Sequence, residues 1–362
     1  MDKWYGIITL GDSMETKVFL MNEEEIDYIA LREAGGILKD GGLVAFPTET
    51  VYGLGGDALN KESSRKIYAA KGRPSDNPLI VHICCMEDLE TIVKHIPEEA
   101  YALANAFWPG PLTMIFEKTD KVPFETTGGL TTVAVRMPKD VIALEFIRES
   151  GGYVAAPSAN ISGKPSPTTA KYVLEDMNGR IEAVIDGGEA VIGLESTIVD
   201  LTGEVPMILR PGYITKEMLL DVIPKVDEDK TMMQEAEGMK PKAPGMKYRH
   251  YAPKGQLTII AGPNDKVIGK INELTAEAEK YGQKTGVIAT KETVDFYKAD
   301  VVKNAGDRND EAAIAKELYR ILREFDDEDV EIIYSESFDE SGIGQAIMNR
   351  LLKAAGYHIE YV

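Results

Sequence analysis

Short apolar runs alternate with amphipathic segments along most of the chain, and this alternation constrains the fold more than any other feature. Residues 43–46, for example, form an apolar run that ends at Pro47, and residues 23–38 carry apolar side chains near helical spacing. A short apolar run bounded by Pro or Gly is typical of a buried strand, and helical spacing predicts an amphipathic helix. The alternation predicts an α/β fold with a mixed, twisted sheet.

The pattern continues to about residue 212 and resumes at residue 256. In the first part, strands are predicted at residues 43–46, 79–83, 112–116, 132–136, 154–156, 183–185 and 196–200, and helices at 23–38, 62–71, 98–107, 140–150 and 170–177. In the second part, strands are predicted at 257–261, 285–289 and 330–334, and helices at 265–281, 312–325 and 343–355. The second part is therefore a smaller α/β unit, with a parallel sheet and crossover helices.

Between the two parts, residues 224–253 mix charges, Met and Pro without a periodic pattern. At roughly 30 residues this segment exceeds ordinary connections, so it is either disordered or functional. A chain of 362 residues is also longer than one domain usually is. We expect one domain at residues 22–215, a linker at 216–254 and a second domain at 255–362.

The net charge of −20 disfavours stable nucleic-acid binding, because such binding needs Lys and Arg to neutralise phosphates. An anion site in this chain must therefore be a local basic pocket. The cysteines, Cys84 and Cys85, are adjacent, so neither a disulfide nor a spaced metal site is expected. Residues 1–20 lack a signal-peptide core, and no stretch approaches the roughly 20 apolar residues of a membrane span. We expect a soluble, cytoplasmic protein.

The segment after the first predicted strand concentrates polar groups. Residues 47–56 read PTETVYGLGG and offer two hydroxyls, a carboxylate and a phenol, followed by glycines that let a backbone approach a ligand. The alternative is a Gly-rich turn with a Thr that caps a helix, since Thr and Gly often serve these roles. The residues alone leave both interpretations open.

The next polar segment supplies cations. Residues 71–74 (KGRP) follow a predicted helix and place Lys71 and Arg73 beside a flexible glycine, with Asn77 as a further donor. Arg offers a planar fork of donors and Lys a mobile point charge, which together suit a phosphate. Basic residues at a helix C-terminus also stabilise the helix dipole, so a structural role stays open.

Residues 155–168 (AAPSANISGKPSPT) form a polar loop after a strand of small residues. Its prolines stiffen it, and its serines, Asn160 and Lys164 can bind an anion or a sugar. A stiff polar loop after a strand is a preferred ligand site in α/β proteins. A Ser-Pro-rich surface loop is the alternative.

Other candidates lie in or near predicted strands. His82 lies within a strand, where a lone histidine is more often a core residue than a catalyst, and Arg136 ends another strand. Ser196 opens a strand, and Arg210 lies near the end of the first domain. One cleft could gather positive charge, attracting ATP and small anions, from Lys71, Arg73, Arg136, Lys164 and Arg210.

Several familiar signatures are absent. The sequence has no G-x-x-x-x-G-K-[ST] phosphate loop, and its four histidines show no zinc-ligand spacing. Residues 342–347 (GIGQAI) lack the third glycine of a dinucleotide fingerprint, and neither Ser158 nor Ser196 lies in a G-x-S-x-G elbow. We expect no metal ligated by protein side chains, no nicotinamide site and no hydrolase triad.

Taken in order, these segments resemble the threonylcarbamoyl-AMP synthase family. The matching strings are PTETVYGLG at 47–55, KGRP at 71–74, NPLIVH at 77–82, PSANISG at 157–163, STIVD at 196–200 and RPG at 210–212. The string GIGQAIMNRL at 342–351 is similar to the extra domain of the two-domain, Sua5-type branch. The resemblance implies a YrdC-like twisted mixed-sheet domain plus a smaller, Rossmann-like C-terminal α/β domain.

The resemblance also implies a nucleotidyltransferase that makes L-threonylcarbamoyl-AMP and pyrophosphate. Its substrates would be L-threonine, bicarbonate or CO2, and ATP, with Mg2+ sharing the neutralisation of phosphate charge. A threonylcarbamoyl transferase complex would then use the product to modify adenosine 37 of tRNA. No stable nucleic-acid or membrane partner is expected for the chain itself.

Carried over by motif, the family's site residues fall into three groups. Threonine would contact Thr50, His82, Arg136, Ser158 and Ser196. ATP would contact Arg73, Asn77, Thr132, Ala156, Ser166, Arg210 and, from a linker folded over the nucleotide, Tyr251. The catalytic residues would be Lys71, Arg73 and Ser158.

Two other functions stay open at this stage. One is an RNA-binding module of YrdC-like fold without adenylation activity, which the net charge of −20 argues against. The other is a carbamoyl-transfer domain of the kind found in hydrogenase maturation. That function would call for acylphosphatase-like or zinc-finger modules, which this sequence lacks.

Overall fold

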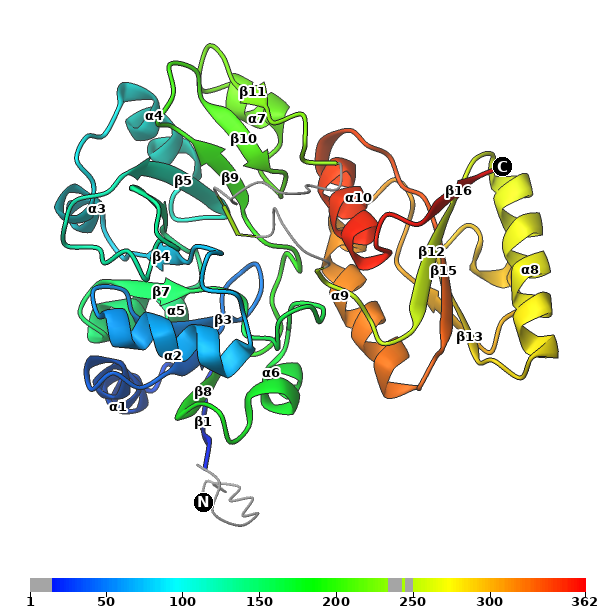
Figure 1. The fold of residues 1–362 in the computed structure, drawn as a ribbon, viewed down its shortest axis with the longest axis horizontal. Coiled ribbons are helices and arrows are strands. Elements are labelled where there is room, and N and C mark those ends of the chain that lie inside the picture. Colours follow the sequence, from blue (N-terminus) through cyan, green and yellow to red (C-terminus); the bar gives the residue numbers. More distant parts are fainter. Residues whose placement is uncertain (1–14, 234–242, 245–249) are drawn as a thin grey trace.

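The structure, a computed structural model, describes residues 15–233, 243–244 and 250–362, and it contains two sheets that lie in separate parts of the molecule (Figure 1). We call the part with the eleven-stranded sheet the N-terminal domain and the part with the five-stranded sheet the C-terminal domain. Helices flank both sheets. The predicted α/β class is confirmed.

The eleven-stranded sheet combines parallel and antiparallel neighbours, in the order β1-β8-β2-β3-β7-β4-β6-β5-β9-β10-β11. Its strands are β1 (Lys17–Leu20), β2 (Val44–Phe46), β3 (Gly53–Asp57), β4 (Ile80–His82), β5 (Leu112–Glu117), β6 (Thr132–Arg136), β7 (Val154–Ala156), β8 (Ala183–Asp186), β9 (Thr197–Asp200), β10 (Met207–Arg210) and β11 (Asp227–Glu228). The edge strand β1 was not predicted from the sequence. Pairing with β8 fixes it.

Alternate strand residues point to opposite sides of this sheet, so each face has its own apolar core. Helices cover both faces. In β2, Val44 and Phe46 belong to one apolar core, whereas Ala45 belongs to the other. Residues of α1 and α5 join the first core, and residues of α2, α4 and α6 join the second. The helices are α1 (Tyr28–Lys39), α2 (Lys61–Lys71), α3 (Met86–Ile92), α4 (Glu98–Phe107), α5 (Val141–Glu149), α6 (Ala170–Met177) and α7 (Lys216–Leu220).

Helix α1 begins at Tyr28, five residues after the predicted start, because side-chain caps override the apolar spacing. The Asp27 carboxylate accepts hydrogen bonds from the backbone N–H groups of Ile29 and Ala30, as an N-cap does. Before it, the Asn22 side-chain oxygen accepts from two further N–H groups and holds the chain in a turn.

Strand β3 corrects the prediction of a glycine-rich loop over residues 47–56. The loop ends at Tyr52, and the glycines that follow pair with β2 and β7 in the sheet. A Cβ atom on Gly53 or Gly55 would lie 3.1 Å from the ring of Phe46. These glycines therefore serve close strand packing rather than loop flexibility.

The five-stranded sheet of the C-terminal domain is entirely parallel, in the order β14-β13-β15-β12-β16. Its strands are β12 (Gln256–Ala261), β13 (Thr285–Ala289), β14 (Val301–Asn304), β15 (Ile332–Glu336) and β16 (Ile359–Tyr361). The connections contain α8 (Asn264–Lys280), α9 (Glu311–Asp327), α10 (Gly342–Ala354) and the short 3-10 helix η1 (Val294–Phe296). The predicted parallel sheet with crossover helices is confirmed, with β14 and β16 added.

Helices α9 and α10 face the N-terminal domain (Figure 1), and the two domains share buried contacts. Val51 and Leu194 of the N-terminal domain belong to the same apolar cluster as Leu318 of α9. Gly193 approaches α9 so closely that a Cβ atom there would lie 2.5 Å from the Cα atom of Lys316. Helix α9 therefore packs directly on the loop before β9.

None of the helices in the described ranges combines the length and apolarity needed to cross a membrane.

Candidate active site

One cavity collects polar side chains from the strand ends and loops of the N-terminal domain and from the linker. Two of these loops are hydrogen bonded to each other, since Ala159 N–H donates to the Tyr52 carbonyl and Tyr52 N–H to the Pro167 carbonyl. The lining residues are Thr48, Thr50, Val51, Tyr52, Gly53, Lys71, Arg73, Ile80, His82, Arg136, Ala156, Pro157, Ser158, Asn160, Ser162, Glu195, Ser196, Arg210, Pro244, His250 and Tyr251.

Beside the cavity, Arg136 and the loop at residues 47–52 form a buried polar pocket. Arg136 Nη1 donates to Thr50 Oγ1 at 2.8 Å, and Arg136 Nη2 lies 2.7 Å from Glu49 Oε1. The Thr48 hydroxyl lies 2.9 Å from that of Thr50 and also donates to the Val51 carbonyl. The Thr50 hydroxyl and a guanidinium are thus held in place beside the cavity.

His82 lies at the end of β4 and is both a core residue and a cavity-lining residue. Its ring meets Phe46 edge to face, with the ring centroids 5.9 Å apart. Burial, assisted by the charge of Arg136, lowers the pKa of His82 to about 3. Nδ1 of His82 is buried and has no hydrogen-bond partner among the described residues. A neutral imidazole therefore faces the cavity.

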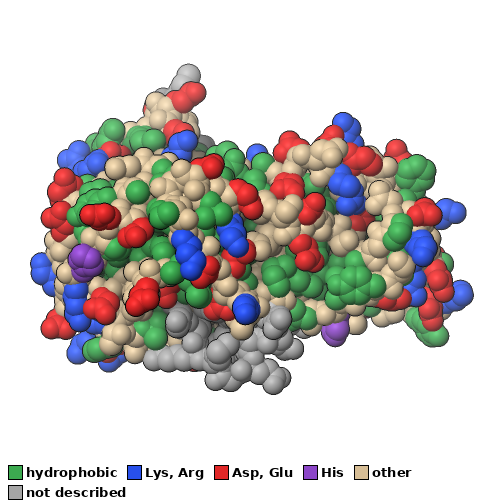
Figure 2. Space-filling view, turned by 90° about the horizontal axis from the view of Figure 1, so that it is seen from above, with side chains coloured by type: hydrophobic (Ala, Val, Ile, Leu, Met, Phe, Trp, Pro, Cys, Tyr) green, Lys and Arg blue, Asp and Glu red, His purple; other side chains and the backbone are tan. Residues whose placement is uncertain are grey.

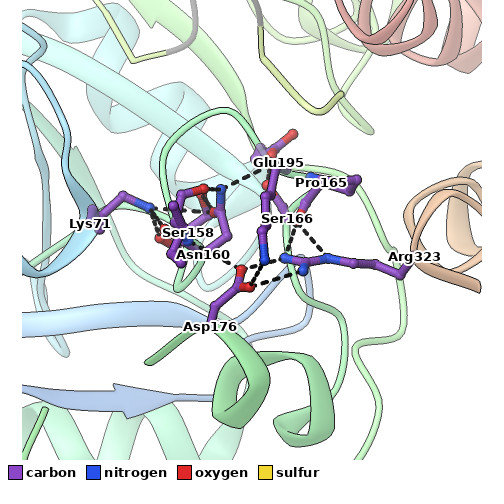
Figure 3. Close-up of polar contacts among 10 residues, drawn as sticks. Lys71, Ser158, Asn160, Pro165, Ser166, Asp176, Glu195 and Arg323 are labelled. Atoms are coloured by element: carbon purple, nitrogen blue, oxygen red, sulfur yellow. Dashed lines mark hydrogen bonds and ion pairs between the residues drawn. The ribbon is translucent and has the colours of Figure 1, made fainter. Parts of the chain in front are cut away.

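Lys71 ends helix α2 and points into the loop that begins at Ser158 (Figure 3). Its ammonium group donates to the backbone carbonyls of Ser158 and Asn160, and the Ser158 hydroxyl donates to Asn160 Oδ1. Burial, with a further contribution from the charge of Arg73, lowers the pKa of Lys71 well below its ordinary value. The Lys71 side chain is 1% exposed, so this ammonium has little access to water.

Arg73 lies two residues further on, beyond the left-handed Gly72 that ends α2. Its guanidinium donates only weakly to carbonyls, at 3.4 Å to Asn77 and 3.3 Å to Pro78. Burial lowers the pKa of Arg73 to about 10. The Asn77 side-chain amide is fully buried and has no partner among the described residues.

Ser196 and Arg210 lie together because β9 and β10 are antiparallel neighbours. Arg210 Nε donates to the Ser196 carbonyl at 3.0 Å, and Nη2 lies 3.2 Å from the Ser196 hydroxyl. That hydroxyl lies 2.7 Å from Thr113 Oγ1 on β5. Burial lowers the pKa of Arg210 as well.

Three described linker residues, Pro244, His250 and Tyr251, line the cavity. Arg210 Nη1 donates to the Pro244 carbonyl at 3.3 Å, and Ala252 N–H donates to the Gly163 carbonyl at 2.8 Å. The Tyr251 ring packs against Tyr319 of α9, with centroids 5.2 Å apart. In the rest of the predicted linker, residues 216–233 contain α7 and β11, and residues 234–242 and 245–249 lie outside the described residues.

The structure brings most of the predicted site residues to this cavity. Those that line it are Thr50, Lys71, Arg73, His82, Arg136, Ala156, Ser158, Ser196, Arg210 and Tyr251. Three others do not line it, namely Asn77, Thr132 and Ser166. The Ser166 hydroxyl donates to Glu195 Oε1 at 2.6 Å, and Thr132 begins β6 opposite Glu117 of β5. Lys164 forms an ion pair with Asp176 at 2.7 Å instead of joining the cavity cations.

Among the lining residues outside the set carried over by motif, three had a signal in the sequence. Asn160 is the only amide in the loop at residues 155–168. Glu195 is a carboxylate in an otherwise apolar stretch, which predicts a buried, paired charge. His250 precedes Tyr251, and burial lowers the pKa of His250 to about 3. Each depends on contacts with distant segments that the local sequence does not show.

The electrostatic character of the cavity follows from these contacts. Lys71 and Arg73 donate to neutral carbonyls, and Arg210 does the same with Ser196 and Pro244. Glu195 is the one carboxylate among the described lining residues, against four cations. Desolvated cations with neutral partners interact strongly with an entering anion, because little water screens them. The cavity suits a polyanionic ligand.

Comparisons with known proteins agree with this geometry. The family model described as "Telomere recombination" matches residues 36–212, and the model described as "Threonylcarbamoyl-AMP synthase, C-terminal domain" matches residues 214–356. The threonylcarbamoyl-AMP synthase of Pyrococcus abyssi is 50% identical over 336 residues, covering 93% of this chain and 97% of the relative. That of Bacillus subtilis is 48% identical over 327 residues, covering 90% of this chain and 93% of the relative.

Solved structures give the same result. The crystal structure of P. abyssi Sua5 complexed with L-threonine matches with a TM-score of 0.91 and 48% identity, covering 96% of this chain and 100% of that chain. A variant of P. abyssi Sua5 with a histidine and the tyrosine after it changed to alanine also matches with a TM-score of 0.91. The YrdC-like fold expected from the motifs is confirmed. Because relatives share about half their residues with it over nearly their whole length, this chain belongs to the threonylcarbamoyl-AMP synthase family.

Proposed function

We propose that this cavity binds L-threonine, bicarbonate or CO2, and ATP, and that the protein converts them to L-threonylcarbamoyl-AMP and pyrophosphate. The observation that carries the proposal is the grouping of Lys71, Arg73 and Arg210, all desolvated, beside the polar pocket of Thr50 and Arg136. A nucleotide triphosphate needs such cations, and a small amino acid needs such a pocket. The relative solved with L-threonine supports the choice of amino acid.

For threonine, we assign the pocket end of the cavity. Arg136 would bind the carboxylate, because a guanidinium fork matches carboxylate geometry. The hydroxyls of Thr50 and Ser196 and the neutral ring of His82 would contact the polar groups of the substrate. Ser158, next to the Lys71 ammonium, would lie nearest the amine and its carbamate. The resemblance to the family implies these contacts, and the five residues all line the cavity.

For ATP, we assign the end formed by Arg73, Arg210 and the linker. The two guanidiniums and Lys71 would neutralise phosphate charge, and the backbone at Ala156 would contact the nucleotide. Asn77, Thr132 and Ser166 stay in the proposal as supporting residues, through backbone groups or through the lining residues that they contact. We further propose that residues 216–254 act as a lid, with Tyr251 packed over the nucleotide.

Mg2+ fits this site only as a partner of the phosphates of ATP. Glu195 is the single carboxylate among the described lining residues, and its oxygens already accept from Ser166, Tyr319 and Arg350. Magnesium prefers oxygen ligands and retains several waters, so the phosphates would hold it. Its contribution would be neutralisation of phosphate charge. The one cluster of candidate metal ligands in the described ranges, formed by Cys84, Cys85 and Asp88, does not line the cavity.

The proposed chemistry needs no nucleophile from the protein. The amine of threonine would attack CO2 and lose a proton, or attack bicarbonate with loss of water, to form a carbamate. The carbamate oxygen would then attack the α-phosphorus of ATP and displace pyrophosphate. The side chains present provide positioning and positive charge, which are the main needs of phosphoryl-type transfer. A closed linker would exclude water from the labile mixed anhydride.

The product would serve a partner that acts on tRNA rather than a nucleic acid bound to this chain. On the face that Figure 2 shows, basic side chains of the described residues are scattered among acidic ones over both domains. The chain carries a net charge of −20, and its desolvated cations are buried in the cavity. We propose that it acts in the cytoplasm and delivers its product to a threonylcarbamoyl transferase complex. The relatives do not favour the alternative of an RNA-binding module.

Mass spectrometry tests the proposed reaction. Purified protein incubated with L-threonine, bicarbonate, Mg2+ and ATP should form a threonylcarbamoyl adenylate and release pyrophosphate in equal amount. Omitting threonine should abolish both products. Replacing threonine with valine, which keeps the shape but lacks the hydroxyl, should reduce the rate strongly. Pyrophosphate release that does not depend on threonine, or no adenylate at all, would contradict the proposal.

A further inference from the structure

Arg350 of helix α10 reaches from the C-terminal domain to the edge of the cavity, and it is fully buried. Its Nε donates to Glu195 Oε2 at 3.1 Å and its Nη2 to the Glu195 carbonyl at 3.3 Å. Its Nη1 donates to the Pro211 carbonyl. One guanidinium thus holds two segments of the other domain, the start of β9 and the end of β10.

These contacts adjoin two residues proposed to bind substrates. Glu195 directly precedes Ser196, and Pro211 directly follows Arg210. Arg210 in turn donates to the carbonyl of Ser196. A shift of either segment would therefore move a proposed threonine contact and a proposed ATP contact together.

Glu195 connects Arg350 to a third segment and to the lid. Its Oε1 accepts from the Ser166 hydroxyl at 2.6 Å, in the loop at residues 155–168 (Figure 3), and its Oε2 accepts from the Tyr319 hydroxyl at 2.9 Å. The ring of Tyr319 also packs on Tyr251. The carboxylate is therefore bound from both domains and lines the cavity.

The charge of Glu195 is offset by two buried arginines, Arg350 and Arg210. Burial by itself raises the pKa of Glu195, but the charges of Arg350 and Arg210 hold it below its ordinary value. Glu195 is thus an anion at the edge of an otherwise cationic cavity, and Arg350 offsets its charge. Without Arg350, the unpaired carboxylate would repel the phosphates of ATP and would compete for Arg210.

We propose that Arg350, acting through Glu195, is a positioning residue for the adenylation site, so that the C-terminal domain completes the site instead of only carrying the linker. The proposal rests on the assignment of the cavity to ATP and threonine. Tyr319 takes part through its hydroxyl on Glu195 and its ring on Tyr251. Binding of ATP, which carries four negative charges, should depend on the charge balance at Glu195 more than binding of the zwitterion threonine does.

Steady-state kinetics with Arg350→Met tests the proposal, because Met retains much of the side-chain volume without the charge. We expect the KM for ATP to rise on the order of tenfold or more, as when coupled buried charges are separated, with a smaller change in the KM for threonine. In the double variant Arg350→Met/Glu195→Gln, removal of the stranded carboxylate should restore part of the ATP affinity. A merely structural role would predict further loss in the double variant.

Arg323→Met is the matched control. Arg323 is an equally buried arginine that crosses the same domain junction from α9, where it binds Asp176 and the Pro165 carbonyl, neither of which lines the cavity (Figure 3). The Arg323→Met variant should lower thermal stability as Arg350→Met does, but its KM for ATP should stay within about twofold of wild type. If both arginine variants give the same KM values at equal folded fraction, the proposal is overturned.

Tyr319→Phe gives a second readout if Arg350→Met does not fold. It keeps the ring on Tyr251 and removes only the hydroxyl on Glu195, so the KM for ATP should rise roughly threefold to tenfold without loss of secondary structure. Unchanged kinetics for this variant would also overturn the proposal. A wild-type protein that forms no adenylate would instead refute the proposed function, so the two failures are distinguishable.

Discussion

Lys71 and Arg73 show at the residue scale how the protein keeps cations available for a ligand. Both are buried, yet neither has a carboxylate partner among the described hydrogen bonds and ion pairs, and their donors reach only backbone carbonyls. Burial lowers both pKa values, which means that the charged forms are held at some energetic expense. An incoming phosphate would supply the missing counter-charge.

Arg73→Ala should therefore abolish activity without destabilising the fold. We expect the rate of adenylate formation to fall by roughly a hundredfold or more, the loss that follows removal of a preorganised charge from a reaction site. The melting temperature should change by no more than about 2 °C, because the long hydrogen bonds of Arg73 contribute little and its repulsion of Arg210 is removed.

Arg65→Ala, on helix α2 just before Arg73, is the control for Arg73→Ala. Arg65 is half exposed and pairs at the surface with Glu62 and Glu125, so its loss should alter neither activity nor stability appreciably. Differential scanning fluorimetry measures the melting temperature of each variant, and a kinetic assay measures its activity. A large fall in the melting temperature of Arg73→Ala would show that Arg73 has a structural role instead.

At the scale of elements, the described part of the linker is held by contacts with both domains. Ala243 joins an apolar cluster of the large sheet with Ile80 and Leu209, and Tyr251 packs on α9. Tyr251 has a positive φ of 66°, which is unusual for a residue with a side chain. Its conformation is therefore selected by these contacts rather than by local preference.

Tyr251→Ala should raise the apparent KM for ATP by roughly tenfold, because the ring that covers the cavity is lost, while kcat changes less. Initial rates at varied ATP and saturating threonine measure this effect. Tyr251→Phe, which keeps the ring, should behave nearly as wild type. An unchanged KM for Tyr251→Ala would show that the linker does not cover the nucleotide.

For the molecule as a whole, two buried histidines contribute to the response of stability to mild acid. Burial lowers the pKa of both His82 and His250 to about 3, whereas the ordinary value is 6.5. Between these pH values the unfolded chain binds protons that the native state does not, so stability falls as the pH decreases from 6.5. Asp140 acts in the opposite direction, because burial raises its pKa to about 6 and the native state gains a proton first.

A comparison of wild type with His82→Gln isolates one histidine from these opposing contributions. Between about pH 6 and pH 5, the free energy of unfolding of wild type should fall by roughly 1 kcal/mol more than that of the variant. Urea unfolding at both pH values measures the difference, in which Asp140 and His250 cancel. Identical pH dependence in the two proteins would mean that His82 takes up a proton in the native state.

Much of the architecture could be predicted from local sequence. Helix α4 and strands β6 and β7 have the predicted limits, because their apolar spacing and their Pro and Gly boundaries are local signals. Strand β3 could not be recognised, since glycines that pack against Phe46 look the same in a sequence as glycines in a loop. The start of α1 was wrong because the cap at Asp27 outweighs apolar periodicity.

The sequence by itself determined the fold class, the order of most of the elements and the family, because ordered motifs and periodicity are properties of neighbouring residues. It also supplied ten of the 21 described residues that line the cavity. Only the tertiary structure decided that Lys71 reaches the carbonyl of Ser158, 87 positions away, and that Arg350 holds Glu195 across 155 positions. Such contacts depend on how sheets and helices pack, and local sequence does not encode which distant charge will compensate a buried one.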